Sequence, residues 1–221
     1  MRTTKHVMCG SVMIGGGAPV SIQSMCNTDT RDPKASLAQI ERLAEAGCEI
    51  IRLAVPDMEA AKGFGEIKKR CPLPMVADIH FDYRLAIAAI ENGADKIRIN
   101  PGNIGSEDKV RAVLKSAKAA GIPIRIGVNS GSLEKEIIAK YGGVTAEGLC
   151  ESAVKAVQYC EGFGFDDIVV SLKSADVQMN HKAHQLFAAQ SDRPLHIGLT
   201  ESGVGTMAEL KSSAALGALL L

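Results

Sequence analysis

The sequence predicts an α/β fold, a TIM (β/α)8-type barrel with seven of the eight βα units and a short N-terminal hairpin. Two observations lead to this prediction. Short β-type apolar runs alternate with helical stretches, and a glycine often separates a helix from the next run, which is typical of βα units. Each run also carries polar residues at alternate positions near its C-terminal end, so these side chains share one face of a strand. In a parallel barrel that face lines the interior, because helices cover the other face.

The sequence predicts that residues 1–19 form a small hairpin that plugs the N-terminal mouth of the barrel, and that residues 20–221 form the barrel itself. In the hairpin, Val12 and Ile14 follow a turn at 9–11. The strands of the barrel are expected at 20–25, 49–55, 74–80, 96–101, 123–129, 167–173 and 195–200.

Capping residues and glycines mark the helices between these strands. Asp32 can cap a helix that has Pro33 at its first position and stops at Gly47. Gly93 and Gly121 follow two further helices in the position of a C′ glycine. After the first helix, the sequence predicts helices at 83–92, 107–120, 133–141, 146–163 and 206–221.

The helix expected at 206–221 is apolar, has no capping residue and is followed by no strand. Seven strands would leave the first and the seventh with unpaired edges, which natural barrels avoid by closing. We therefore expect a truncated chain that lacks the eighth βα unit.

The composition is that of a globular domain without a strong preference for polyanions or lipid. Among 221 residues, 46% are apolar and 23% are charged, and 25 basic residues balance 25 acidic ones, which argues against nucleic-acid or membrane binding. No apolar run is long enough for a membrane span, and the N-terminus lacks the apolar stretch of a signal peptide. The six cysteines include no C-x-x-C pair, so we expect reduced thiols in a cytoplasmic protein and no metal bound by this chain.

The inner face of the predicted barrel carries an excess of positive charge. Its cations are Arg52, Arg98, Arg125 and Lys173, against the single carboxylate of Asp78. One arginine could form a structural ion pair with that carboxylate, but four cations could not all be neutralised by it. Guanidinium groups on separate strands suit an anion with several oxygens, such as a phosphate. The sequence therefore predicts an anion site at the barrel mouth.

Neutral and titratable groups accompany these cations. The glycines of the loops 100–105 and 200–205 would let backbone N–H groups approach a phosphate. His80 and His196 are the inward groups that can move protons near neutral pH, and with Asp78 they are the expected catalytic residues. The expected substrate-binding residues are Arg52, Arg98, Asn100, Arg125, Asn129, Ser171, Lys173, Thr200, Gly203 and Gly205.

Several long motifs resemble the 4-hydroxy-3-methylbut-2-en-1-yl diphosphate synthase family over nearly the whole chain. They are QSM at 23–25, NTDTRD at 27–32, VPDMEAA at 55–61, ADIHFDYR at 77–84, RINPGNIG at 98–105 and RIGVN at 125–129. The resemblance implies an iron–sulfur oxidoreductase of the methylerythritol phosphate route to isoprenoids. Its substrate would be a cyclic diphosphate, 2-C-methyl-D-erythritol 2,4-cyclodiphosphate, which is opened with two electrons and loss of water. The cations of the inner face match the family's diphosphate-binding positions.

The sequence departs from this family in its redox part. The resemblance implies a [4Fe-4S] cluster on a separate C-terminal domain, held by three cysteines and a glutamate, and none of the six cysteines here matches those ligands. It also implies flavodoxin or ferredoxin as the electron donor and a homodimer when the protein is complete. We therefore expect this chain to be a substrate-binding barrel that is inactive alone.

Two alternatives remain open from the sequence. One is an iron-free barrel enzyme that binds a pterin or a phosphosugar, similar to dihydropteroate synthase. The other is a non-catalytic remnant that binds a diphosphate.

Overall fold

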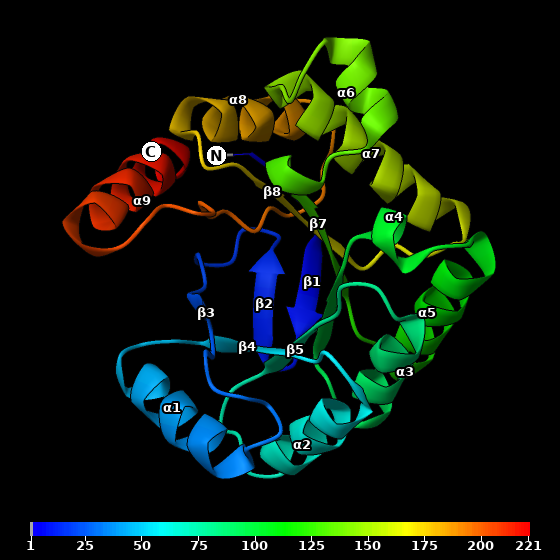
Figure 1. Cartoon of the computed structure of the whole chain (residues 1–221), viewed down its shortest axis with the longest axis vertical. Helices are drawn as coiled ribbons and strands as arrows, with labels where there is room; N and C mark the ends of the chain where they lie inside the picture. Colours follow the sequence, from blue (N-terminus) through cyan, green and yellow to red (C-terminus); the bar gives the residue numbers. More distant parts are fainter. Residues whose placement is uncertain (1) are drawn as a thin grey trace.

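A curled sheet of six parallel strands, with helices around its outer face, forms the body of the molecule (Figure 1). The computed structural model describes residues 2–221, apart from the side chains of residues 101 and 102. Neighbours in the sheet follow the order of the chain, as expected for consecutive βα units. The strands are β3 (Gln23–Met25), β4 (Ile50–Ala54), β5 (Met75–Asp78), β6 (Lys96–Ile99), β7 (Ile124–Asn129) and β8 (Ile168–Lys173).

Most helices lie close to the positions expected from the sequence, but a short helix at Pro101–Ile104 forms within the loop expected at 100–105. Asp32 caps the first helix, where its side chain accepts a hydrogen bond from the backbone N–H of Ala35. Gly121 ends another helix in the left-handed conformation that favours glycine, at φ 67°. The helices are α1 (Pro33–Glu45), α2 (Met58–Lys68), α3 (Tyr83–Glu91), α4 (Pro101–Ile104), α5 (Glu107–Ala120), a 3-10 turn at Ser130–Ser132, α6 (Lys135–Tyr141), α7 (Ala146–Gly162), α8 (Val177–Ala188) and α9 (Gly205–Leu220).

The prediction of a seventh strand at 195–200 was wrong. Only Leu195 pairs there, through an isolated parallel bridge to Val170 of β8. The chain then runs beside β8 with sparse bonds, and the carbonyl of Gly198 accepts from the side chain of Asn180 on α8 instead of from a strand. A glycine has low β-propensity, and within the described residues this segment pairs on one side only, so a regular ladder does not form. The sheet is therefore open between this segment and β3.

The outer faces of the strands form the main core. Alternate strand residues such as Ile97, Ile124 and Leu172 are fully buried between the sheet and the helices. The alternation of apolar and polar residues in the sequence predicted that this face would pack against the helices. The inner face is thereby left to the polar residues of the same strands.

An antiparallel hairpin of β1 (His6–Cys9) and β2 (Val12–Gly15) sits at the centre of the ring of helices in Figure 1. Cys9 is fully buried and packs with Ile50 and Val76, which lie toward the N-terminal ends of their strands. The hairpin thus forms an apolar floor beneath the polar interior of the barrel.

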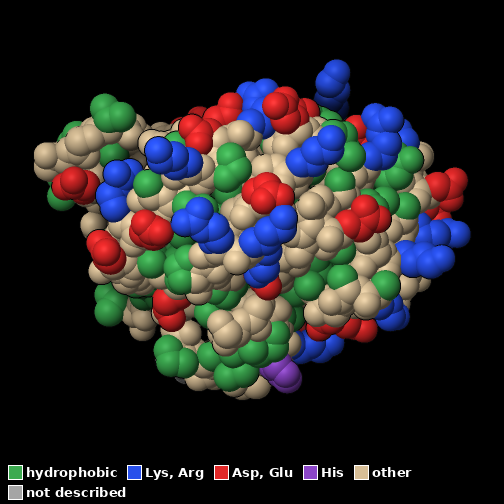
Figure 2. All heavy atoms as spheres, turned by 90° about the horizontal axis from the view of Figure 1, so that it is seen from below, with side chains coloured by type: hydrophobic (Ala, Val, Ile, Leu, Met, Phe, Trp, Pro, Cys, Tyr) green, Lys and Arg blue, Asp and Glu red, His purple; other side chains and the backbone are tan. Residues whose placement is uncertain are grey.

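The molecular surface shows mixed charge. Figure 2 shows acidic and basic side chains interspersed over one face, without a field of a single sign. Among the described residues, no helix is both long and apolar enough to cross a bilayer.

A close contact between α2 and the loop after β3 gives a test of this packing. A Cβ added at Gly63 would lie 2.2 Å from the backbone oxygen of Thr30, a buried residue whose hydroxyl donates to the carbonyl of Ala54 at 2.6 Å. Because that backbone cannot shift freely, we expect Gly63→Ala to lower the free energy of unfolding by about 1–3 kcal/mol. Urea denaturation would measure it.

The matched control is Gly162→Ala at the end of α7, where an added Cβ meets no heavy atom within 4 Å. This variant should be as stable as the parent chain or slightly more stable. Equal urea midpoints for Gly63→Ala and the parent chain would contradict the described contact.

Candidate functional site

The carboxylate of Asp78 joins side chains from three neighbouring strands. Arg98 of β6 donates from Nη1 to Oδ1 at 3.2 Å, and Arg52 of β4 lies with Nε 3.7 Å from Oδ2. His80, just beyond the end of β5, places Nε2 3.8 Å from the same Oδ2. The strand register places Asp78 directly opposite Arg98, which is why the two can meet. One buried carboxylate thus holds two guanidinium groups and an imidazole at the C-terminal end of the sheet.

Arg125 lies beside this group without a counter-charge of its own. It is the register partner of Arg98 on β7, and its side chain is fully buried. Neither its Nε nor its Nη1 has a hydrogen-bond partner among the described residues. Burial, reinforced by the charges of Arg52 and Arg98, lowers the pKa of Arg125 to about 9, while the charge of Asp78 opposes this shift. A buried cation in this state is destabilised until an anion approaches it.

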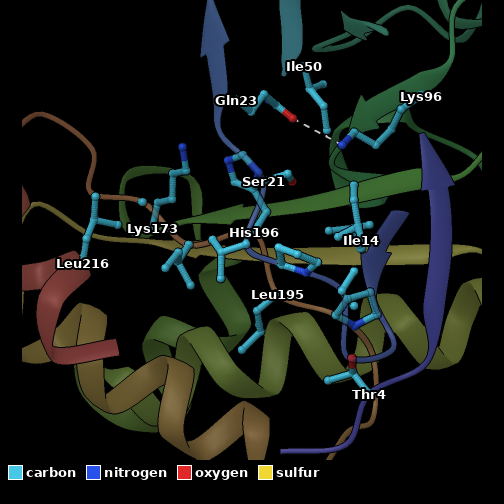
Figure 3. Close-up of a pocket in the computed structure, with 18 of the residues that line it drawn as sticks. Thr4, Ile14, Ser21, Gln23, Ile50, Lys96, Lys173, Leu195, His196 and Leu216 are labelled. Atoms are coloured by element: carbon cyan, nitrogen blue, oxygen red, sulfur yellow. Dashed lines mark hydrogen bonds between the residues drawn. The ribbon is translucent and has the colours of Figure 1, made fainter. Parts of the chain in front are cut away.

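A cavity of about 450 Å³ opens between β3 and the segment 194–199. Figure 3 shows Gln23 and Lys96 meeting there through a hydrogen bond, with Lys173 and His196 among the other lining residues. Among the described residues that line this cavity, none carries a carboxylate. Two lysines, Lys96 and Lys173, thus line this cavity without a carboxylate beside them in its lining.

Burial and the interior cations together set the protonation of two residues that line the cavity. Burial, together with the charges of Arg125, Arg52 and Arg98, lowers the pKa of Lys173 to about 7. Burial and the same kind of repulsion, chiefly from Arg125, hold the pKa of His196 well below its ordinary value. The imidazole of His196 is therefore neutral at neutral pH, and the amine of Lys173 is close to half protonated.

Lys96 was missed by the sequence analysis. It is the first residue of β6, its side chain is almost fully buried, and its Nζ donates to Oε1 of Gln23 at 3.2 Å. Burial lowers its pKa to about 8. The signal was present, because Lys96 stands two residues before Arg98 and so shares its face. With Lys96 added to the four expected cations, the inner face carries five basic side chains and the single carboxylate of Asp78.

The other polar residues expected to bind the substrate lie on different strands and make different backbone contacts. Asn100 is buried at the end of β6, and Asn129 is the register partner of Lys173. The hydroxyl of Ser171 points into the sheet and donates to the carbonyl of Ile126 at 3.5 Å. The backbone N–H of Thr200 donates to Ser174 at 3.5 Å.

The loop that precedes α9 is exposed. Gly203 and Gly205 adopt positive φ values of 97° and 65°, and a Cβ at either position would meet no heavy atom within 4 Å. These glycines are explained by the conformation of the backbone, and no close approach to another group requires them.

The cysteines do not form a metal centre within the described residues. No group of three or more His, Cys, Asp or Glu side chains there could hold a metal ion. The six thiols are free, and burial raises the pKa of Cys26 to about 11 and that of Cys160 to about 12, so both stay protonated. A cluster needs converging thiolates. The described residues therefore do not fit an iron–sulfur cluster.

Sequence comparison adds a family to this geometry. The family model described as the GcpE TIM-barrel domain matches residues 4–221. The 4-hydroxy-3-methylbut-2-en-1-yl diphosphate synthase (flavodoxin) of Caldanaerobacter subterraneus is 54% identical over 219 residues, which cover 99% of this chain and 62% of that protein. The Bacillus subtilis protein of the same name is 55% identical over 98% of this chain and 58% of its own length. This chain thus spans about 60% of the length of these relatives.

Structural comparison shows the barrel fold in more distant proteins. Phospho-2-dehydro-3-deoxyheptonate aldolase from Thermotoga maritima matches 97% of this chain and 62% of its own with a TM-score of 0.69 and 14% identity. Dihydropteroate synthase from Xanthomonas albilineans matches 97% of this chain and 96% of its own with a TM-score of 0.57 and 14% identity. At such identities the likeness concerns the fold alone, so it lends no support to a pterin-binding function.

The position of Asp78 among the cations predicts a measurable shift. Because the carboxylate of Asp78 raises the pKa of Lys173, replacing it by the neutral amide in Asp78→Asn should lower the pKa of Lys173 further below about 7. NMR titration of isotope-labelled lysine side chains would follow the Lys173 signal, after circular dichroism has shown that the variant is folded.

Asp29→Asn serves as the control, because Asp29 is an exposed partner of Arg31. It should leave the titration of Lys173 unchanged. A Lys173 pKa that does not respond to Asp78→Asn would mean that the carboxylate does not act on this amine.

Proposed function

The chain belongs to the GcpE TIM-barrel domain family, and from this premise we propose that it supplies the substrate-binding barrel of a 4-hydroxy-3-methylbut-2-en-1-yl diphosphate synthase. The reaction would open 2-C-methyl-D-erythritol 2,4-cyclodiphosphate to 4-hydroxy-3-methylbut-2-enyl diphosphate, with two electrons and loss of water, in non-mevalonate isoprenoid biosynthesis. In this proposal residues 1–19 are the hairpin plug and 20–221 are the binding barrel.

The uncompensated positive charge of the barrel interior carries the proposal. Five basic side chains accompany one carboxylate, and two nitrogen atoms of the buried Arg125, Nε and Nη1, have no hydrogen-bond partner among the described residues. Burying a charge without a counter-ion costs several kcal/mol, roughly, so the arrangement favours a ligand that brings negative charge. A diphosphate brings several charged oxygens, and guanidinium forks match their geometry.

Each side chain has a role within this proposal. Asp78 orients the fork of Arg98 through a hydrogen bond and attracts Arg52, whose own fork donates to Sδ of Met25. Lys173 completes the ring of cations around the ligand. Neutral groups at the mouth would bind the hydroxyls, and the loop glycines would admit backbone N–H groups. These further substrate-binding positions are Asn100, Asn129, Ser171, Thr200, Gly203 and Gly205.

Proton transfer is proposed for three residues. About half of the His80 side chain is exposed, and it lies beside Asp78, so it can exchange protons with solvent while the carboxylate orients it. His196 is neutral while the cations around it are uncompensated. A bound anion would offset those charges and raise the pKa of His196, so that proton uptake there would accompany binding.

The redox part of the proposed reaction needs a [4Fe-4S] cluster, which when bound would relay the two electrons, one at a time, from an external donor to the substrate. Since the described residues do not fit such a cluster, the proposal assigns its three cysteines and one glutamate to the length of the relatives that this chain does not span. The names of those relatives include flavodoxin, which we propose as the electron donor, with ferredoxin as the alternative. We propose that the complete protein is a cytoplasmic homodimer. The positive and negative charges interspersed on its surface give no support to nucleic-acid binding.

Arg125 should show opposite effects on binding and on stability. Arg125→Met keeps an unbranched stem but removes the guanidinium group and its charge. We expect it to weaken binding of the cyclic diphosphate by about 1.5–3 kcal/mol, the scale of a charged hydrogen bond, in titration calorimetry. We also expect a higher melting temperature without ligand, because the variant removes a buried charge that has no counter-ion.

Arg193→Met is the matched control, because Arg193 is also buried but is paired with Glu161 at 2.5 Å and Asp166 at 2.6 Å. That variant should melt at a lower temperature and, if folded, bind the ligand as the parent chain does. Unchanged affinity in Arg125→Met would remove Arg125 from the proposed site.

The reaction itself can be tested with a fusion protein. The 221 residues would be joined to the part of the Bacillus subtilis relative that follows the matched region, reconstituted with iron and sulfide, and supplied with reduced flavodoxin. We expect product from the fusion and only binding from the barrel chain. Binding without turnover by the fusion would favour a diphosphate-binding remnant, and failure of the barrel to bind would contradict the proposed function.

A further inference from the structure

Gly127 occupies a position on β7 where the backbone does not require glycine. It lies on the inner face, between Arg125 and Asn129 in the alternation of the strand, and it is buried. Its φ angle is not positive, so any residue could adopt this conformation. Glycine inside a strand lowers stability, because it orders a flexible backbone and packs no side chain. The reason for glycine at 127 must therefore lie in the space around it.

That space is filled by the guanidinium group of Arg98. A Cβ added at Gly127 would lie 2.6 Å from Nε of Arg98, 2.9 Å from Nη2 and 3.2 Å from Cζ. The register pairs Arg98 with Arg125, two residues before Gly127, so the side chain of Arg98 leans toward the C-terminal end of β7. The bare backbone at 127 is what allows the guanidinium to lie there.

Arg98 has little freedom to move away. Its Nη1 is bonded to Asp78, it is only 9% exposed, and its buried Nε has no partner among the described residues. The like charges of Arg52 and Arg125 act on the same region. A guanidinium pushed out by a methyl group at 127 would have to leave the carboxylate or approach these cations.

We propose that Gly127 is a positioning residue of the anion site, which fixes the guanidinium of Arg98 where it bonds Asp78 and presents its remaining donors to a phosphate-type anion. The reference to the anion rests on the proposed function. A different explanation is that glycine leaves room for the ligand itself. In that case an added methyl group would interfere with binding whether or not Arg98 is present.

A double-mutant cycle separates the two explanations. Inorganic pyrophosphate is titrated calorimetrically into the parent chain, Gly127→Ala, Arg98→Ala and the double variant. We expect Gly127→Ala to weaken binding at least about tenfold, the loss of roughly one charge-assisted hydrogen bond. In the Arg98→Ala background the same substitution should change affinity less than about twofold, because the methyl group then has room. Gly162→Ala should bind as the parent chain does, since an added Cβ there meets nothing within 4 Å.

A second measurement does not depend on any ligand. The buried Nε–H group of Arg98 should give an NMR signal that is absent in Arg98→Ala and displaced in Gly127→Ala. If the parent chain does not bind pyrophosphate, the proposed function fails and this signal alone decides the role of Gly127. If alanine at 127 prevents folding, the double variant should restore it.

Three results would overturn the inference. They are unchanged affinity with an unmoved Arg98 signal in Gly127→Ala, an equal loss of affinity with and without Arg98, and a double variant that stays unfolded when Gly127→Ala is unfolded.

Discussion

The interior of the barrel depends on one carboxylate shared by two guanidinium groups. Asp78 bonds Arg98 and lies within ion-pair distance of Arg52, and no other carboxylate takes part in the cationic cluster among the described residues. One negative charge cannot offset five positive ones, so the folded chain retains buried positive charge. The sheet tolerates this because its outer face, with residues such as Ile97 and Ile124, is fully buried against the helices. The apolar packing outside thus maintains a charge imbalance inside.

Burial and this charge imbalance together lower the pKa values of two interior lysines. The amine of Lys173 titrates near pH 7 and that of Lys96 near pH 8, against an ordinary value of 10.5 for both. Between these values and 10.5 the unfolded chain binds more protons than the folded one, so these two groups make the free energy of unfolding rise with pH across that window. An anion in the barrel would reverse the repulsion and favour the protonated amines. The same charges that limit stability would therefore couple the binding of an anion to the uptake of protons.

The sequence predicted the convergence of Arg52, Asp78 and Arg98 because strand alternation is a local property that can be counted along the chain. The prediction of a seventh strand was wrong because a β-ladder depends on neighbours that are distant in sequence. The carbonyl of Gly198 accepts a hydrogen bond from a side chain of α8 instead. The contact between Gly127 and Arg98 could not be predicted from the sequence either, because it depends on the register of two strands and on the direction of one side chain. Lys96 could have been found, because it begins the strand expected at 96–101 and has the same parity as Arg98.

The apolar floor of the barrel also affects the electrostatics of the interior. Cys9 of the hairpin packs with Ile50 and Val76 directly below the polar interior, and the charge of Lys96 acts on its thiol. A floor of this kind keeps water away from the lower cations, and charges interact more strongly where water is excluded. The burial that lowers the pKa of Lys96 is therefore produced partly by a hairpin at the opposite end of the strands from the mouth. If an anion binds at the mouth, packing at the floor would affect its affinity through this buried lysine.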